Sequence, residues 1–288
     1  MTSQVMAAYL RGRCSGGRAA RSVRAVTATP TRSTFGPLLR QWRTRRRLSQ
    51  LDLAVESDVS ARHISFLETG RSQPSREMVL RLATQLDVPL RERNQLLLGA
   101  GYAPEYRARS LDDAEMAPVR AAVDAVLRAH APHPALAVDR HWELVSANAG
   151  IDLLTRGVAP HLLEPPVNVL RLSLHPDGLA GRIRNLAEWR GHVLGRLARE
   201  HAVTGDPRTR ALLHELAALP GGRSLGATNA VAVPLRMEAG GRELAFLSTV
   251  TTFGTAVDVT LAELSIEAFL PADAATAEAM AALVADGG

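Results

Sequence analysis

The stretch LSQLDLAVESDVSARHISFLETGRSQPS, residues 48–75, determines how the first part of this chain folds. Ser49, Ser60 and Ser75 each precede a segment whose apolar residues recur at helical spacing. Serine favours the N-cap position because its hydroxyl accepts a hydrogen bond from a backbone N–H of the first helical turn. The three serines therefore predict three successive helix starts, with a turn at Asp58 between the first two helices.

The first two of these helices form a helix–turn–helix that runs from Ser49 to Glu68. Its inward side chains are apolar, and the small Ala54 marks the place where the helices cross closely. The turn at Asp58 calls for a left-handed backbone, which glycine adopts most easily and aspartate tolerates. The inward residues are Leu53, Ala54, Val59, Ile64 and Leu67.

The second helix of the motif presents a short polar strip, which has the size and chemistry to enter the major groove of DNA. Arg62 is suited to bidentate hydrogen bonds with guanine, and His63 and Ser65 to base edges or phosphates. Gln50 begins a helix, where backbone N–H groups attract phosphate, and we expect it to brace its neighbour as well. The residues expected at the DNA are Gln50, Ser60, Ala61, Arg62, His63, Ser65 and Arg71.

The length of the chain indicates about two domains, and the charge distribution indicates that a polyanion, if one is bound, meets the first. The chain has 288 residues, of which 46% are hydrophobic and 22% charged, and its net charge is +5. Residues 1–34 carry six arginines and no acid, and residues 35–110 carry 13 arginines and eight acids. Residues 111–288 carry 15 arginines and 21 acids, so a nucleic acid would be bound by the N-terminal third.

Several classes of protein are excluded. The single cysteine, Cys14, rules out a disulfide framework and a multi-cysteine metal site. No stretch of ~18 apolar residues is present, which rules out an ordinary transmembrane helix. A secretory h-region is also missing, so we expect a cytoplasmic protein without a membrane partner.

We expect four parts along the chain: a disordered basic arm at 1–33, a helix–turn–helix domain at 34–100, a linker at 101–118 and a second domain at 119–283. The arm is either a solvated tail or a non-specific nucleic-acid contact. Its composition also resembles that of a transit peptide. A start codon assigned too far upstream would be another explanation for this segment. The fold class is α+β overall, with an all-α five-helix domain followed by an α+β domain that contains an antiparallel sheet.

The second half of the chain mixes helical and strand periods. Ala239-Gly240-Gly241 predicts a hairpin turn between two of its strands. Strands are predicted at 134–138, 142–147, 230–237, 243–253 and 261–270, and helices at 118–130, 148–155, 178–201 and 207–219.

Two family resemblances support this division. Residues 48–75 resemble the XRE/Cro-like helix–turn–helix domain, although Asp58 stands where that family prefers glycine. The segment NVLRLSLHPDGLAGRIRNLAEWRGHVLGRL at 168–197, together with 101–150 and 234–277, is similar to the MmyB-like transcription regulators. That resemblance covers nearly all of 35–283 and implies a PAS-like C-terminal domain that binds a ligand of the fatty-acid type.

A sheet with helices on one side can enclose an apolar pocket. We expect four aromatic residues as pocket walls, and two arginines and a histidine as partners of a carboxylate head group. The simpler alternative is core packing for the aromatics and an internal ion pair for an arginine, for instance with Glu188. The wall candidates are Trp142, Trp189, Phe246 and Phe253, and the head-group candidates are Arg171, His175 and Arg190.

These observations predict a sequence-specific DNA-binding transcription regulator that binds double-stranded DNA as a homodimer and senses a small lipophilic ligand. The alternative is a regulator whose second domain serves only dimerisation. An enzyme is not expected, because His214-Glu215 lacks the second histidine of a zinc-protease helix and no nucleophile–base set is present. No metal and no cofactor are expected, apart from a possible bound fatty acid or similar molecule.

Overall fold

The computed structural model describes residues 35–222, 232–254 and 256–286, which divide into two compact units. One unit is made of 35–109 with 256–262, and the other of 110–222, 232–254 and 263–286. The predicted fold class is confirmed, since five helices precede a domain with a five-stranded antiparallel sheet and helices. The basic arm predicted at 1–33 lies outside the described residues.

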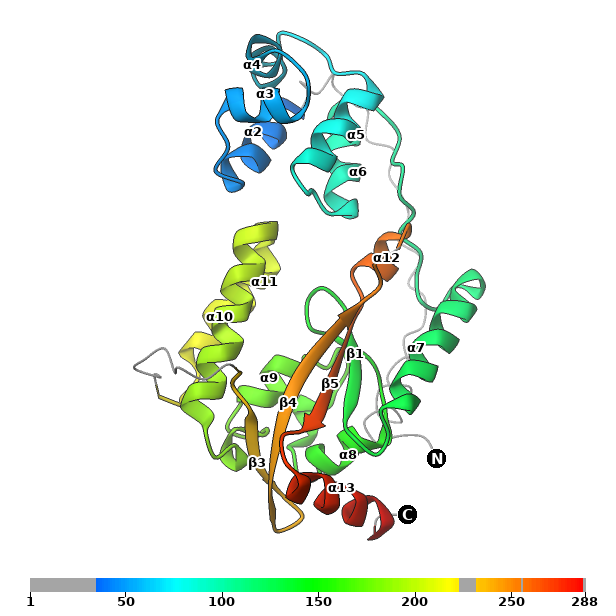
Figure 1. The fold of residues 1–288 in the computed structure, drawn as a ribbon, viewed down its shortest axis with the longest axis vertical. Coiled ribbons are helices and arrows are strands. Elements are labelled where there is room, and N and C mark those ends of the chain that lie inside the picture. The colour runs from blue at the N-terminus through cyan, green and yellow to red at the C-terminus, as the bar shows by residue number, and fades with distance from the viewer. Residues whose placement is uncertain (1–34, 223–231, 255, 287–288) are drawn as a thin grey trace. The chain divides into compact units, whose positions relative to one another are not determined.

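Three helices of the helical unit begin directly after the predicted N-cap serines. The hydroxyls of Ser49, Ser60 and Ser75 each accept a hydrogen bond of 3.1–3.2 Å from the backbone N–H three residues later. The turn at Asp58 has a φ of 52°, and Gly70 ends the following helix with a φ of 73°. The helices are α2 (Phe35–Arg45), α3 (Gln50–Glu56), α4 (Ala61–Thr69), α5 (Arg76–Gln85) and α6 (Leu90–Gly99), drawn in blue to cyan in Figure 1.

The core of this unit is apolar and closely packed. Gly36 lies against the end of α4, where an added Cβ would stand 2.5 Å from the backbone oxygen of Glu68. A side chain at position 36 would therefore push α2 away from α4. The fully buried core residues include Phe35, Leu39, Leu53, Ile64, Leu67, Val79, Leu82, Leu86, Leu96 and Leu97.

A distant segment of the chain completes the helical unit. The short helix α12 (Val259–Ala262) follows strand β4 (Arg242–Thr252) in the sequence but belongs to this unit. The backbone N–H of Val259 donates to the Arg107 carbonyl at 2.8 Å, and the Thr260 hydroxyl donates to the Arg109 carbonyl at 2.6 Å. Val259 is fully buried. Residues 107 and 109, which the sequence placed in a linker, thus hold a second chain segment.

The other unit is built on a curled antiparallel sheet of five strands in the order β2-β1-β5-β4-β3 (Figure 1). Four α-helices lie between β2 and β3 in the described part of this connection, and β5 pairs with β1 to join the last three strands to the first two. The strands are β1 (Ala135–Val138), β2 (Leu144–Ala147), β3 (Leu235–Ala239), β4 (Arg242–Thr252) and β5 (Ser265–Pro271). The helices are α7 (Ala117–Ala129), α8 (Ala149–Thr155), α9 (Val169–Leu174), α10 (Leu186–Thr204), α11 (Pro207–Ala218) and α13 (Ala274–Asp286).

Each face of the sheet has its own core. On one face, Leu136, Phe246 and Phe269 pack with residues of α8 to α11. On the opposite face, Val123 and Leu127 of α7 pack with small residues of β1 and β5. The larger cluster, on the side of helices α8 to α11, contains the space in which a ligand can lie.

Several predicted boundaries were wrong. The predicted strand 261–270 starts only at Ser265, because the Asp258 side chain accepts from the Thr260 N–H at 2.9 Å and turns the preceding residues into α12. The long helix predicted from residue 178 starts at Leu186, after a 3-10 turn at Ala180–Arg182. Helices α9 and α13 were not predicted. No helix among the residues that the structure describes has the length and apolarity to cross a membrane.

Candidate nucleic-acid interface and ligand cavity

The outer side of α4 carries the polar strip that the sequence predicts. Ile64 and Leu67 are buried, whereas Arg62 is exposed and His63 and Ser65 are half-buried. Ser60 is exposed and Ala61 half-buried at the start of this helix. The structure therefore brings these five residues, 60–63 and 65, onto one short helix.

Two arginines converge on a single aromatic ring at this surface. The Arg62 guanidinium carbon lies 5.2 Å from the centre of the Phe66 ring, and that of Arg71 lies 6.0 Å from it. Both arginines are exposed, and a cation over a ring face is held by the ring quadrupole. Phe66 thus orients the two cations that the sequence assigned to the DNA, although sequence reasoning had not singled out Phe66 itself.

Gln50 has an internal partner. Its side-chain amide nitrogen donates to Oε2 of Glu68 at 2.8 Å. Glu68 also receives two hydrogen bonds from Arg43, at 2.6 and 2.9 Å. The expected bracing function of Gln50 thus has a partner in Glu68, and its amide nitrogen is engaged within the protein.

The arginines at the end of α2 differ in their surroundings. Arg46 donates to the carbonyls of Leu86 and Asp87, both at 2.8 Å, and so binds the C-terminal end of α5. Arg45 lies over the ring of Trp42 at 5.0 Å, and burial lowers its pKa. Arg47 is exposed and has a φ of 59°. Of the three, Arg47 is the one with an exposed side chain.

The second unit contains a mainly apolar cavity of about 60 Å³ between the sheet and helices α8 to α10. Trp189 is a wall residue, and its indole N–H donates to the Ser173 hydroxyl at 2.9 Å. The lining residues are Leu136, Ile151, Leu154, Thr155, Val169, Leu170, Leu172, Ser173, Leu179, Trp189, His192, Val193, Arg196, Leu235, Glu267 and Phe269.

One part of the cavity wall is charged, and sequence reasoning did not identify it. Arg196 of α10 donates to Oε1 of Glu267 of β5 at 3.1 Å, and both side chains line the cavity. His192, one turn before Arg196, completes this polar wall and stacks on Trp189 with ring centres 5.4 Å apart. Burial lowers the pKa of His192, and the charge of Arg196 adds to this effect. The sequence signal for this wall was Glu267 itself, a charged residue between apolar neighbours in a predicted strand.

The other predicted wall residues lie apart from the cavity lining. Phe246 is fully buried in the main core, where it contacts Phe269 edge-on at 6.5 Å. Phe253 packs with the cluster on the opposite face of the sheet. Trp142 lies behind the polar wall: its ring is 4.1 Å from the Arg196 guanidinium carbon, and its N–H donates to Glu200 at 2.9 Å.

The predicted head-group residues also have other partners. Arg171 forms a two-bond pair with Glu215, at 2.5 and 2.9 Å, on the protein surface. Arg190 is buried and donates to the carbonyls of Ala217 and Gly222, and not to Glu188. These contacts resemble the alternative that the sequence left open, in which the arginines have internal partners.

His175 lies in a small cluster of possible metal ligands. Its ring is 5.8 Å from that of His161, and its Nδ1 accepts from the Asp177 N–H at 3.1 Å. The ligand atoms of these three residues lie within 4.8 Å of one another. None of the three lines the cavity between the sheet and helices α8 to α10.

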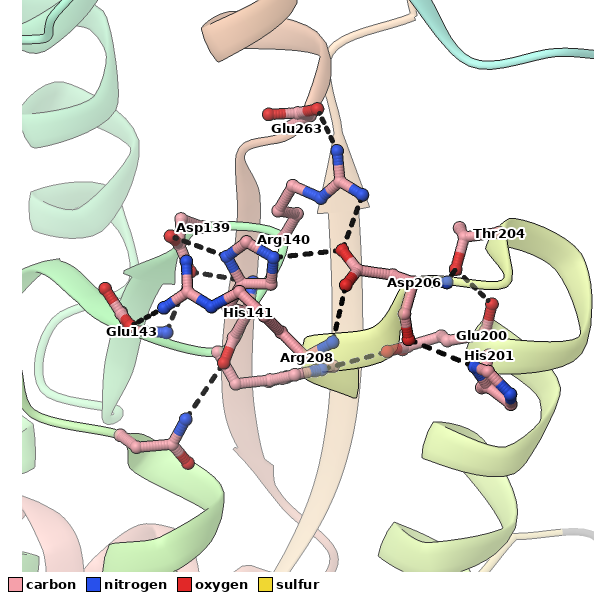
Figure 2. A network of polar contacts seen from close by, with 12 residues as sticks. Asp139, Arg140, His141, Glu143, Glu200, His201, Thr204, Asp206, Arg208 and Glu263 are labelled. Carbon is pink, nitrogen blue, oxygen red and sulfur yellow. Dashed lines mark hydrogen bonds and ion pairs between the residues drawn. The ribbon is translucent and has the colours of Figure 1, made fainter. Parts of the chain in front are cut away.

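A polar network ties the β1–β2 turn to the α10–α11 junction (Figure 2). Asp206 accepts from Arg140 at 2.6 Å and contacts His141 Nε2 at 3.0 Å, while Arg140 also binds Glu263 at 2.9 Å. Burial alone would raise the pKa of Asp206, but the N–H of Arg208, His141 and Arg140 outweigh it and lower the pKa to about 2. The network therefore depends on an ionised Asp206.

Fold and side chains together define a DNA-binding regulator with a second, ligand-binding domain. The family model described as the MmyB-like transcription regulator ligand binding domain matches residues 119–283, and a helix-turn-helix model matches residues 39–93. The chain belongs to the MmyB-like transcription regulators.

Part of the chain is similar to a protein of known structure. The restriction-modification controller protein C.AhdI from Aeromonas hydrophila, known from a high-resolution crystal structure, is 38% identical in sequence over the matched part. The match covers 21% of this chain and 92% of that chain, with a TM-score of 0.20. Among curated proteins, no match to this chain is found.

Proposed function

We propose that this regulator binds its operator as a cytoplasmic homodimer, with α4 in the major groove. The observation that supports this most directly is the polar strip of α4, which contains the exposed Arg62 and is followed by the exposed Arg71. One short helix contacts few base pairs, so two half-sites are needed to give adequate specificity. Arg62 specifies a base in this proposal, and Arg71 binds the phosphate backbone.

Selection of binding sites from random duplex DNA tests this part. We expect an enriched sequence with two inverted half-sites about one helical turn apart. Sedimentation of the purified protein should show a dimer. A chain that enriches no sequence, and binds all duplexes equally at low ionic strength, would contradict sequence-specific recognition.

We further propose that the second domain senses a small, lipophilic, fatty-acid-like ligand. The cavity between the sheet and helices α8 to α10 supports this, because its walls are mainly apolar. Their polar parts are Thr155, Ser173 and the wall formed by His192, Arg196 and Glu267. A ligand changes DNA binding only when it binds two arrangements of the protein with different affinity. Site selection with and without a lipid extract would therefore show whether ligand alters operator affinity.

One observation favours the alternative, in which the second domain serves only dimerisation. The cavity of about 60 Å³ is smaller than the engineered apolar cavity of roughly 150 Å³ that accepts benzene. A longer ligand therefore requires the walls to move. Native mass spectrometry separates the two functions, because a co-purified acyl compound supports sensing. Failure of every added lipid to bind, with an intact dimer, would favour dimerisation alone.

A further inference from the structure

We infer that the polar wall of the cavity selects an apolar ligand whose end is a hydrogen-bond donor without negative charge, such as a hydroxyl, amide or amine, and disfavours a carboxylate. This inference rests on the proposed ligand-sensing function and departs from it at the head group: the apolar chain of a fatty-acid-like ligand is kept, but its carboxylate is replaced by a donor without negative charge. It follows from how the charges of Arg196 and Glu267 are already used within the protein.

The only cation in the cavity wall, as far as the described residues show, is neutralised by acids. Arg196 donates to Glu267 at 3.1 Å, and its Nε is 3.5 Å from Oε1 of Glu200. Its guanidinium also lies over the ring of Trp142. The planar face of the Arg196 guanidinium is therefore occupied by the Trp142 ring, and its N–H groups and charge are directed to Glu267 and Glu200. Two carboxylates lie beside this one cation without any ligand.

Separating Glu267 from Arg196 would cost much free energy. Its side chain is only 5% exposed, and its Oε1 accepts from both Arg196 and the Ser248 hydroxyl. A ligand carboxylate that took Arg196 would leave the Glu267 carboxylate buried beside a second negative charge. Breaking a buried ion pair in this way is strongly unfavourable. The resident acid therefore occupies the position that a ligand carboxylate would need.

The same wall accepts a hydrogen-bond donor. No described residue donates to Oε2 of Glu267, so this carboxylate oxygen is available to a hydroxyl or an ammonium group. Burial and the charge of Arg196 lower the pKa of His192; Glu267 opposes this shift, and Arg199 adds to it. A neutral His192 ring adds no positive charge that would attract a carboxylate, but it can bond a hydroxyl through either ring nitrogen.

Probes of equal chain length test the inference in the full-length protein. Hexanol, hexylamine and hexanoate, with the matching decyl compounds, are titrated at neutral pH by calorimetry and by NMR of the Trp189 indole N–H. We expect the alcohol or the amine to bind at least about tenfold more tightly than the carboxylate of the same length.

Substituting Glu267 tests the cause. Glu267→Gln releases Arg196 from its acidic partner, so the carboxylate should gain about tenfold in affinity. The alcohol and the amine lose the second carboxylate oxygen as an acceptor and should not gain. Glu243→Gln on the exposed side of β4 is the matched control and should leave all affinities unchanged. The wild-type comparison decides the question even if Glu267→Gln does not fold.

The outcomes separate the two proposals. Tightest binding of the carboxylate to the wild-type protein would overturn the head-group inference but leave ligand sensing intact. Absence of binding by all six probes, with an unmoved Trp189 signal, would overturn ligand sensing by this cavity and the inference with it.

Discussion

Arg43 and Glu68 form a two-bond ion pair inside the helical unit, with Nε–Oε1 at 2.6 Å and Nη2–Oε2 at 2.9 Å. The Glu68 side chain is 3% exposed, and the remaining nitrogen of Arg43 donates to the Leu48 carbonyl at 2.8 Å. The pair joins α2 to the end of α4, and Gln50 adds the start of α3. Three helices that position the DNA-facing strip therefore meet at one carboxylate.

Removal of this carboxylate should loosen the helical unit. Glu68→Ala leaves Arg43 buried without its partner, which we expect to cost about 3–5 kcal/mol of unfolding free energy. Hydrogen exchange of the buried α4 amides measures this. Replacing both partners, with Arg43→Met and Glu68→Leu, should recover much of the loss. The exposed Glu56→Ala is the control, and equal effects of Glu56→Ala and Glu68→Ala would refute the importance of the pair.

The turn between α3 and α4 should respond to backbone conformation. Asp58 has a φ of 52°, a region that costs ordinary L-residues about 1–2 kcal/mol. We expect Asp58→Ala to destabilise the helical unit, whereas Asp58→Gly should be at least about 1 kcal/mol more stable than Asp58→Ala. The same exchange measurement compares them. If alanine and glycine behave alike, the left-handed turn does not limit stability.

Arg62 and Arg71 should differ in their effect on DNA recognition. Arg62→Ala should weaken operator binding by about 1–3 kcal/mol and relax the preference at one base position. Arg71→Ala should instead weaken binding to all sequences by similar factors. Binding to the selected operator and to single-base variants distinguishes them. An unchanged base preference in Arg62→Ala would reject its contact with guanine.

The salt dependence of DNA binding should identify Arg47, and not Arg46, as a phosphate contact. Arg47→Ala should lower the slope of log affinity against log salt by about 0.9. Arg46→Ala should leave this slope unchanged and destabilise α5, because the carbonyls of Leu86 and Asp87 lose their donor. A salt titration with each variant checks this. A lowered slope in Arg46→Ala without loss of stability would contradict it.

Acid should weaken the network around Asp206. The native pKa of Asp206, about 2, lies below the usual value of 3.8, so the ionised form stabilises the folded state. Its contribution is complete above about pH 5 and is lost as the pH falls towards the native pKa. Asp206→Asn should therefore be less stable than the wild type at pH 7 and approach it near pH 2.

Asparagine is the sharper substitution at this position because it retains the helix cap. Asp206 accepts from the Arg208 N–H at 2.7 Å and begins α11, a function that asparagine also performs. Asp206→Ala loses both the cap and the charge and should remain less stable at every pH. Parallel urea unfolding curves from pH 7 to 2 give the comparison. A constant gap between wild type and Asp206→Asn would show that the charge does not contribute.

The helix–turn–helix could be predicted from sequence because its determinants are local. The caps at Ser49, Ser60 and Ser75 act within three residues, and the turn at Asp58 depends on its own backbone. The boundaries of the sheet were less predictable. Residues 261–264 have a strand-like apolar pattern, but the Asp258 side chain caps the preceding segment as a helix.

The polar wall of the cavity could not be predicted in the same way. Arg196 and Glu267 are 71 positions apart, and nothing local in either segment reveals that they meet. Arg190, by contrast, stands out in the sequence as a cation on an apolar helix face. Its partners are backbone carbonyls, which every residue carries, so the sequence cannot indicate which residues accept its hydrogen bonds.

The inclusion of α12 in the helical unit means that this protein cannot be dissected with a single cut. A fragment that starts after Arg109 would carry Val259 into water without the backbone carbonyls of residues 107 and 109 that hold it. Aggregation or low stability of such a fragment would then result from the exposed α12 and would not show that the second domain is unstable by itself. Fragment mapping of this regulator therefore needs a short artificial loop in place of 255–262.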